Sequence, residues 1–513
     1  MKKLALLTSA LAIVSLSACK QNNKAESDKK PNIILIYIDD LGYGDVSAYG
    51  ATAVKTPNVD SLASNGLKFT DAHSSASTCT PSRFSLLTGS YAFRNNAAIL
   101  PGDAPLIINP EQETIADMLK SAGYKTGVVG KWHLGLGDGK PDWNGVIKPG
   151  PLEIGFDYSF LIPATPDRVP TVFVENHRVV NLDPKDPIQI DYDQRIGTDP
   201  IGLDDEEALK MKADTQHSGT VVNGISRIGF MSGGHSAYWK DEEFPNVLTA
   251  KATDFITQHK DEPFFLYFSL PDIHVPRAPN QKFVGSTNMG PRGDAIVQMD
   301  WMTGQIMKKL KELNLDQNTL IIFSSDNGPV LDDGYADQAE TNIGSHKPAG
   351  DFKGGKYSAY EGGTRVPTIA YWPAKITAGV SDALISQVDF FATLAKLVGV
   401  EIKAEATAPD SFEMLDVLLG KSKNGRDHLI EEAFTMSLRM GEYKYIAPQS
   451  KPTPDWLANK KVASGLQKTP QLYNLKTDPK EENNLATQNP NKTTEMANYL
   501  ATIMKSPSKN PLK

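Results

Sequence analysis

Apolar and polar positions alternate along the chain with two periods, one typical of short strands and one of helices. Residues 32–40 (NIILIYIDD) form a nearly continuous β-branched run, which predicts a buried strand that ends at Asp39 and Asp40. Residues 113–124 (ETIADMLKSAGY) have the apolar spacing of an amphipathic helix that closes at Gly123. This alternation predicts an α/β fold with a large, mostly parallel mixed sheet flanked by helices.

Polar residues of the kinds used in catalysis follow several predicted strands. Three further apolar runs end in this way: residues 125–135 at Lys131 and His133, residues 262–276 at His274, and residues 318–329 at Asp326 and Asn327. A single aspartate after a strand is commonly a helix cap or a turn residue. Four such ends together indicate a functional site, because the carboxyl ends of strands in an open α/β sheet form its ligand crevice.

The chemistry of these residues favours a hard cation. The oxygen donors at the strand ends are Asp39, Asp40, Asp326 and Asn327. A set of oxygen ligands selects Ca²⁺ or Mg²⁺ over zinc or copper, and we prefer Ca²⁺. Two adjacent carboxylates buried without a cation would repel each other. For Asp39 and Asp40 taken alone, an exposed turn remains the alternative.

The chain after about residue 420 has a different pattern. Short antiparallel strands are predicted in residues 428–447 and 471–475, an insertion in residues 455–470 and a final helix in residues 493–505. We therefore expect an α/β catalytic domain over residues 31–420 and a small C-terminal α+β subdomain with a short antiparallel sheet over residues 421–513. Residues 381–405 are predicted to form a helix of the larger domain.

The N-terminus has the layout of an export signal. Residues 1–19 combine two lysines, an apolar run too short to span a membrane, and the ending LSAC. That ending resembles the lipobox of bacterial lipoproteins, which implies that Cys19 is lipidated and that residues 20–30 form a flexible tether. We expect an exported protein, lipid-anchored in the cell envelope on the periplasmic or the outer side. A buried core cysteine is the alternative for Cys19.

The composition and the net charge indicate which kinds of molecule the protein binds. The 513 residues are 40% hydrophobic and 22% charged, as in an ordinary globular protein, and the net charge is −8. This charge argues against nucleic acid as a partner, although a local basic pocket could still bind an anionic substrate. The chain has two cysteines, so a lipidated Cys19 leaves Cys79 as the only thiol and excludes an internal disulfide.

Cys79 begins a predicted helix. In residues 79–91 (CTPSRFSLLTGSY), Pro81 suits a first helical turn and the later apolar residues have helical spacing. A helix N-terminus favours anions and lowers the pKa of a thiol, which predicts an activated Cys79. Arg83 lies one helical turn further on, so these residues together predict an anion site beside a nucleophile.

The segment Cys79-Thr80-Pro81-Ser82-Arg83 resembles the C-x-P-S-R signature of formylglycine-dependent, arylsulfatase-like sulfatases of the alkaline phosphatase superfamily. Further blocks resemble the family in the family's order: GKWHLG, HVP, SSDNG, GGKYSAYEGGTRVP and LYNLKTDPKEENNL. The similarity extends from about residue 31 to residue 490. It implies an alkaline phosphatase-like fold and hydrolysis of a sulfate ester.

The resemblance also implies a modified nucleophile. A separate maturation enzyme would oxidise Cys79 to Cα-formylglycine, whose hydrated aldehyde has two hydroxyl groups on one carbon. One hydroxyl would attack sulfur and release the alcohol, and the other would collapse the covalent sulfate back to the aldehyde. The displacement is thereby divided into two easier steps.

Further roles follow from the resemblance, position by position. The calcium ligands would be Asp39, Asp40, Asp326, Asn327 and an oxygen of residue 79. Arg83 would orient the formylglycine, and His133 would contact its non-attacking hydroxyl as a candidate base. Lys131, His274 and Lys356 would bind sulfate. Either His274 or Lys356 could protonate the leaving oxygen.

The expected substrate is a sulfated carbohydrate, a polysaccharide or a glycan fragment, with a galactose or N-acetylgalactosamine type of sugar preferred. Candidate contacts outside the shared blocks are Asp167, Arg168, His177, Arg178, His217, Arg227, His346 and Lys347, with surface salt bridges as the alternative. Two other functions stay open: a phosphonate or phosphate monoester hydrolase of the same superfamily, and a glycan-binding lipoprotein without catalysis.

Overall fold

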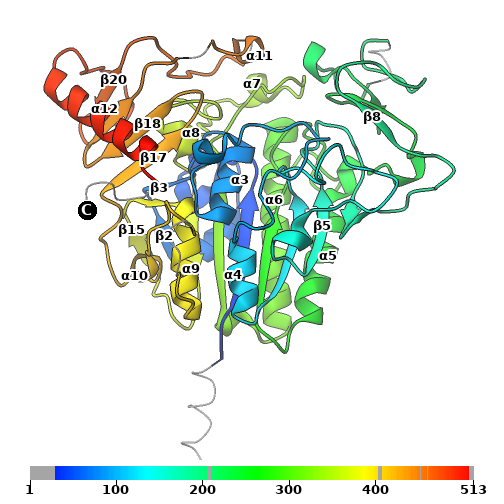
Figure 1. Cartoon of the computed structure of the whole chain (residues 1–513), viewed down its shortest axis with the longest axis horizontal. Coiled ribbons are helices and arrows are strands. Elements are labelled where there is room, and N and C mark those ends of the chain that lie inside the picture. The colour runs from blue at the N-terminus through cyan, green and yellow to red at the C-terminus, as the bar shows by residue number, and fades with distance from the viewer. Residues whose placement is uncertain (1–28, 205–208, 403–406, 451, 459, 508–513) are drawn as a thin grey trace, which may run out of the picture.

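The structure is a computed structural model that describes residues 29–204, 209–402, 407–450, 452–458 and 460–507 (Figure 1). The predicted signal peptide, Cys19 and the tether up to residue 28 lie outside these residues. Within the described part, no helix combines the length and the apolar character needed to cross a membrane.

A ten-stranded mixed sheet forms the centre of the molecule, in the order β15-β2-β14-β13-β1-β12-β4-β5-β6-β7. Its middle strands are β13 (Thr319–Ser325), β1 (Asn32–Ile38), β12 (Phe264–Ser269) and β4 (Lys125–Lys131). These four are neighbours and run parallel, which confirms the four strands predicted from the apolar runs. Their residues are almost entirely buried, as expected for strands covered on both faces.

The remaining strands extend the sheet at both edges. They are β2 (Leu67–Phe69), β14 (Thr368–Tyr371), β15 (Gly379–Ser381), β5 (Tyr158–Ile162), β6 (Val174–Glu175) and β7 (Arg178–Val179). Antiparallel pairing of β14 with β13 and of β6 with β5 makes the sheet mixed. Short pairs outside it join β9 (Val221–Val222) with β10 (Ile225–Ser226), β8 (Gln189–Asp191) with β11 (Phe230–Ser232), and β3 (Ala72–His73) with β16 (Ile385–Ser386).

Helices cover both faces of the sheet (Figure 1). One face carries α3 (Cys79–Thr88), α4 (Ile115–Ser121) and α9 (Phe390–Val398), and the other carries α2 (Pro57–Asn65), α5 (Phe244–Gln258) and α6 (Gly290–Glu312). Two separate apolar cores, one on each face, hold these layers together. The helix predicted in residues 113–124 is α4, which Thr114 caps through its hydroxyl.

The single helix predicted for residues 381–405 is wrong. The segment begins with the end of β15 and with β16, and the helix α9 starts only at Phe390. Ser386 caps a 3₁₀ turn over Gln387–Asp389, in which the Ser386 N–H donates to the Asp389 carboxylate, so the helical geometry begins only after Ser386 and continues into α9. Gly399 then ends the helix with φ of +77°.

The C-terminal residues form the predicted antiparallel sheet. Its four strands are β17 (His428–Glu432), β18 (Met436–Met440), β19 (Tyr443–Ile446) and β20 (Gln471–Asn474), and α12 (Pro490–Lys505) packs on them. α11 (Asp455–Ala458) lies in the insertion. The apolar core beneath this sheet includes Tyr91 and Val388 of the larger part. The boundary between residues 420 and 421 stays a prediction.

Buried charges join the two parts. The Lys444 ammonium is fully buried and lies 3.0 Å from a carboxylate oxygen of Glu361 and 3.0 Å from one of Glu431. A carboxylate oxygen of Glu481 is 3.9 Å from the same nitrogen. One cation thus faces three carboxylates, and burial together with the nearby Glu361 raises the pKa of Glu481 to about 8, although Lys444 opposes the shift.

This junction predicts a pH dependence of stability. Because the pKa of Glu481 rises from 4.5 to about 8 on folding, its contribution to stability is complete below pH 4.5 and is lost as the pH rises through about 8. The Tm should therefore fall by several degrees from pH 5 to pH 8. We expect Glu481→Gln to flatten this fall in calorimetry, whereas Glu482→Gln at the exposed neighbouring position should not. Equal pH profiles for the two variants would contradict the assignment.

Candidate active site

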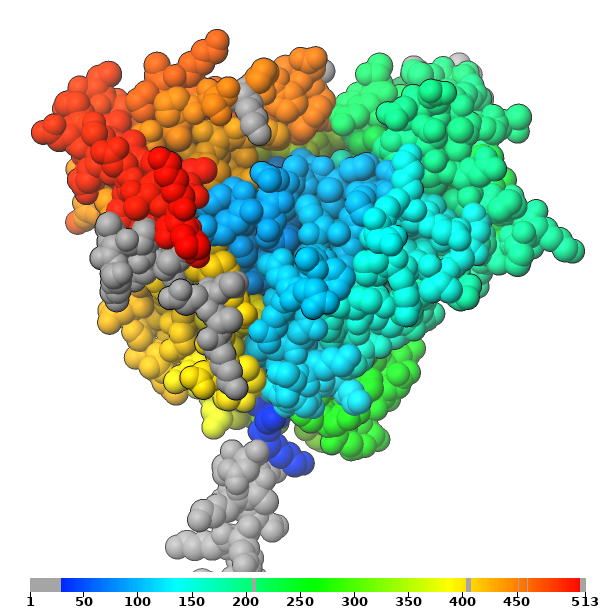
Figure 2. Space-filling view, in the orientation of Figure 1, coloured from blue at the N-terminus to red at the C-terminus, as the bar shows by residue number. Residues whose placement is uncertain are grey.

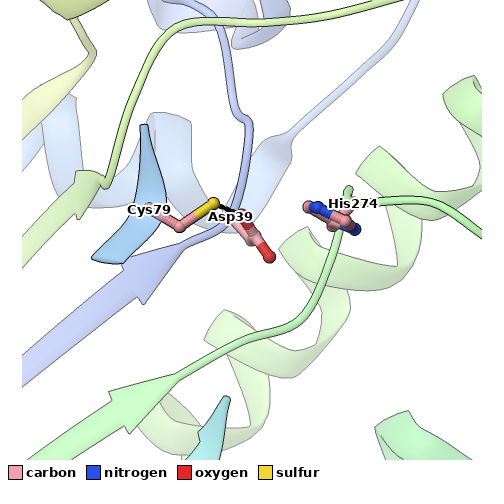
Figure 3. Close-up of side chains that lie close together, drawn as sticks. All are labelled: Asp39, Cys79 and His274. Atoms are coloured by element: carbon pink, nitrogen blue, oxygen red, sulfur yellow. Dashed lines mark hydrogen bonds between the residues drawn. The ribbon is translucent and has the colours of Figure 1, made fainter. Parts of the chain in front are cut away.

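The strand ends predicted from the sequence meet at one point. Ligand atoms of Asp39, Asp40, Asp326 and Cys79 all lie within 4.8 Å of one another, and all four side chains are buried. Asp39 and Asp40 follow β1, Asp326 follows the neighbouring β13, and Cys79 is the first residue of α3. Figure 3 shows the Cys79 sulfur directed toward the Asp39 carboxylate, with His274 opposite.

This carboxylate cluster fits a cation. The Asn327 amide donates to Asp40 at 2.7 Å, while its Oδ1 atom is buried and has no hydrogen-bond partner among the described residues. An unpartnered buried carbonyl oxygen next to three buried carboxylates is costly unless a positive charge compensates. Burial and the adjacent Asp326 carboxylate raise the pKa of Asp39 well above its ordinary value, which reflects this crowding. The donors are oxygens, with one sulfur from residue 79, so Ca²⁺ or Mg²⁺ suits them.

Cys79 has the predicted position but not the predicted acidity. The helix α3 begins at this residue as expected. Burial nevertheless raises the pKa of the Cys79 thiol, and the charges of Asp326 and Asp39 add to the shift although Lys131 opposes it. The prediction of an activated thiol is wrong, because desolvation and two carboxylates outweigh the helix dipole.

Arg83 is fully buried and anchors the cluster from one helical turn away. Its Nη2 and Nε atoms donate to the same carboxylate oxygen of Asp326 at 2.8 and 3.0 Å. Its Nη1 atom donates to the Ser269 hydroxyl and, at 3.3 Å, to the Lys131 carbonyl oxygen. The guanidinium therefore ties α3 to the ends of three central strands.

Two buried lysines lie against the same carboxylates. The Lys131 ammonium contacts Asp39 at 2.5 Å and Asp326 at 3.7 Å. The Lys356 ammonium lies 2.9 Å from Asp40 and 2.9 Å from Asp333. Burial opposes the charge of Lys356, but these two carboxylates raise its pKa well above the ordinary value, so it stays cationic.

The two histidines have fixed orientations. The His274 Nδ1 atom donates to the Val275 carbonyl at 2.6 Å, which leaves Nε2 without a hydrogen bond to any described residue and 3.9 Å from Asp40. The His133 Nε2 atom donates to the Leu100 carbonyl at 2.9 Å, and its buried Nδ1 atom has no partner in the described part of the chain. Burial and nearby cations lower the pKa of both rings, that of His274 to about 4, so both are neutral here.

A cavity of about 400 Å³, termed the catalytic cavity below, opens onto Cys79, His133, His274 and Lys356. Three of the eight loop residues proposed as substrate contacts line it: Asp167, Arg168 and His217. The other five lie elsewhere: His177 on Glu153, Arg178 exposed on β7, Arg227 on Asp241, His346 on Asp45 and Lys347 on Asp351. These five residues form salt bridges or lie exposed on the surface, and none of them lines the catalytic cavity.

Several lining residues were not predicted, namely Asp333, Tyr357, Phe434, Trp456 and Lys460. Asp333 holds the Lys356 ammonium and accepts the Tyr357 hydroxyl at 3.1 Å. Tyr357 is adjacent to Lys356 in a recognised block, which could have suggested it. Phe434, Trp456 and Lys460 come from the C-terminal part, where no local pattern marked them.

The mixed sheet and the carboxylate cluster at its carboxyl edge are the arrangement expected of a hydrolase of the alkaline phosphatase-like superfamily. Residues 31–400 match the family model described as Sulfatase, and the chain belongs to the sulfatase family. It is therefore a sulfuric ester hydrolase.

Similar proteins cover nearly the whole chain. An N-acetylgalactosamine-6-O-sulfatase of Bacteroides thetaiotaomicron is 49% identical over 96% of this chain and 97% of its own length. Human arylsulfatase A is 33% identical over 89% of this chain and 83% of its own. A solved structure from a study of the metabolism of multiple glycosaminoglycans by Bacteroides thetaiotaomicron has a TM-score of 0.91 at 50% identity, covering 93% of this chain and 100% of that one.

A more distant structural neighbour shares the fold. The phosphonate monoester hydrolase of Agrobacterium radiobacter matches with a TM-score of 0.58 at 18% identity, over 94% of this chain and 97% of that one. At this identity the likeness concerns the fold.

Proposed function

We propose that this sulfatase removes the 6-O-sulfate from N-acetylgalactosamine residues of sulfated carbohydrates, with a formylglycine made from Cys79 and one Ca²⁺. The observation that carries the proposal is the cluster of Asp39, Asp40, Asp326 and Cys79, whose Cys79 lines a cavity that also carries cationic and imidazole groups. The 49% identity to an N-acetylgalactosamine-6-O-sulfatase over nearly the full length supports the choice of sugar and position.

The metal would be held by Asp39, Asp40, Asp326, Asn327 and residue 79. A bound Ca²⁺ supplies positive charge that offsets the three carboxylates and attracts the anionic substrate. The side-chain carbonyl oxygen of Asn327 supports this assignment, because it is buried and has no hydrogen-bond partner among the described residues, so it is available to bind a cation. The preference for Ca²⁺ over Mg²⁺ remains a proposal.

Modification of Cys79 by a maturation enzyme accounts for the state of its thiol. A buried thiol whose pKa is raised is a poor nucleophile. The hydrated aldehyde of formylglycine would supply a hydroxyl for attack on sulfur instead. Arg83 fixes Asp326 and the start of α3, and thereby positions residue 79.

The remaining residues would bind sulfate and move protons. Lys356 stays charged between Asp40 and Asp333 and suits binding of the sulfate oxygens, with Lys131 behind Asp39 adding charge. Lys356 is engaged by two carboxylates, so we assign protonation of the leaving oxygen to His274. The neutral ring has its proton on Nδ1; a bound sulfate anion would raise the pKa of the ring, so that the Nε2 atom takes up the proton that it then donates. The free Nδ1 atom of His133 suits a base for the second step.

We also propose that the protein is anchored to the cell envelope through Cys19 and reaches its substrate on the outside of the inner membrane. The support is the sequence pattern of residues 1–19. We further propose that residues 421–513 act as a subdomain that completes the rim of the catalytic cavity, because Phe434, Trp456 and Lys460 line it.

The proposal predicts positional specificity. Protein from a host that performs the maturation should release sulfate from N-acetylgalactosamine 6-sulfate at least about a hundredfold faster, in kcat/KM, than from the 4-sulfate, because a misplaced sulfate leaves the charged groups of the cavity unpaired. Ion chromatography of released sulfate measures both rates. Comparable rates would contradict the assigned position, and faster cleavage of a phosphonate monoester would favour the rival hydrolase.

A further inference from the structure

We infer that a second cavity next to the catalytic one binds the sugar attached to the sulfated residue, and that it selects a neutral sugar over one carrying a carboxylate or another sulfate. This inference rests on the proposed function, whose substrate it specifies further. The second cavity is termed the side cavity below.

The side cavity is larger than the catalytic cavity. Its volume is about 770 Å³, against about 400 Å³, and both lie in the range of about 300–1,000 Å³ common for small-molecule sites. Three segments line it, residues 212–216, residues 331–341 and the region of α11. In Figure 1, α11 and α7 (Ala339–Asn342) lie beyond the carboxyl ends of the central strands, and in Figure 2 the orange C-terminal segment meets the green segment there.

The two cavities are continuous. Gln216, Trp456 and Lys460 line both of them. The Lys460 ammonium lies 3.5 Å from Asp214, which lines the side cavity, and 3.5 Å from Asp333, which lines the catalytic cavity. A substrate larger than one sugar can therefore extend from the catalytic cavity past Lys460 into the side cavity and stay in contact with the protein throughout.

The border also carries an aromatic surface. The ring of Trp456 packs against those of Tyr357 and Phe434, with centroids 5.1 and 5.8 Å away. Trp456 is only half-buried, so part of its indole faces the cavities that it lines. Aromatic side chains of this kind pack well against the C–H face of a sugar ring and are rigid enough to orient it.

The two cavities differ in charge. The catalytic cavity has Arg168, Lys356, Lys460 and three histidines against the carboxylates Asp167 and Asp333. The side cavity has two lysines, Lys212 and Lys460, against the carboxylates Asp214, Asp332, Asp337, Glu340 and Asp455. Arg277, Lys460 and Lys461 pair with three of these, namely Asp337, Asp214 and Glu340. Asp332 and Asp455 have no salt bridge within the described residues.

This contrast sets the specificity. Cationic groups near the nucleophile favour one sulfate, while carboxylates in the side cavity can accept hydrogen bonds from sugar hydroxyls. A second anionic group there would lie among like charges, which costs free energy. The preferred substrate is therefore an N-acetylgalactosamine 6-sulfate followed by a neutral sugar.

The test compares two disaccharides in which N-acetylgalactosamine 6-sulfate is linked either to galactose or to glucuronate. We expect kcat/KM for the galactose disaccharide to be about tenfold higher or more, which corresponds to one unfavourable charge contact. The double variant Asp332→Asn/Asp455→Asn should reduce this ratio toward one. Asp351→Asn, which removes an exposed carboxylate that lines neither cavity, should keep the ratio. For each variant, kcat/KM for a disaccharide is divided by kcat/KM of the same variant for the monosaccharide.

The outcomes separate the two proposals. Release of sulfate from the monosaccharide together with equal or faster cleavage of the glucuronate disaccharide would overturn the side-cavity inference and leave the proposed function intact. An unchanged ratio in the double variant would also overturn it. No release from the monosaccharide or either disaccharide by formylglycine-containing protein would overturn the proposed function and this inference with it.

Discussion

Replacing Cys79 with alanine is expected to lower kcat/KM for sulfate release by more than about 10⁴-fold, since the change removes the group from which the nucleophile is made. The substitution should leave the fold intact. The Cys79 side chain is small and buried at the start of α3, and its thiol makes a weak hydrogen bond to Asp39, at 3.7 Å. The rate is measured with N-acetylgalactosamine 6-sulfate.

A matched control comes from the same helix. The buried Ser85 hydroxyl donates to the Pro81 carbonyl at 3.0 Å and does not line the catalytic cavity. Ser85→Ala should keep sulfate release within a few-fold of the unmodified chain, with a similar Tm. Sulfate release by Cys79→Ala at the rate of Ser85→Ala would refute the assignment of residue 79 as the nucleophile.

The second large effect is expected at the carboxylate cluster. In the absence of metal, the buried carboxylates of Asp39, Asp40 and Asp326 repel one another. Ca²⁺ that binds only the folded state should raise the Tm of the wild-type chain by several degrees over protein in a chelator. Asp39→Asn should abolish most of this rise and lower kcat/KM by about 10³-fold or more. Calorimetry with and without Ca²⁺ provides a readout independent of activity.

A surface carboxylate gives the control for this experiment. Asp351 is exposed and pairs with the exposed Lys347, far from the cluster in character and burial, so Asp351→Asn should retain the full effect of Ca²⁺ on Tm. A Tm of the wild-type chain that is the same in Ca²⁺ and in chelator would contradict a cation site at Asp39. If Asp39→Asn kept the rise in Tm with Ca²⁺, the cation would bind at a site that does not include Asp39.

The sequence was sufficient to predict the centre of the fold and the composition of the site. Runs such as residues 32–38 are apolar throughout because both faces of the central strands are covered, and this makes them recognisable. Parallel neighbouring strands place their carboxyl ends at one edge, so Asp39, Asp326 and Lys131 had to meet. The motif around Cys79 then indicated the chemistry.

Other features depend on long-range packing and could not be predicted locally. Trp456 and Lys460 reach the catalytic cavity from an insertion in the C-terminal part, which is far from Cys79 in the sequence. The acidity of the thiol depended on burial and on Asp326, neither of which the helix position reveals. Polar residues on loops, such as Arg227 and His346, were indistinguishable from ligand contacts until their buried partners Asp241 and Asp45 were known.

The chemical state of residue 79 tests the account most directly. Protein purified from its native host is digested with trypsin, and the mass of the peptide spanning residues 69–83 is measured. Formylglycine lowers this mass by about 18 Da relative to cysteine, because the CH₂SH side chain becomes an aldehyde and so loses sulfur and two hydrogens and gains oxygen. We predict that the lighter peptide predominates. An unmodified cysteine in protein that still releases sulfate would contradict the proposed mechanism.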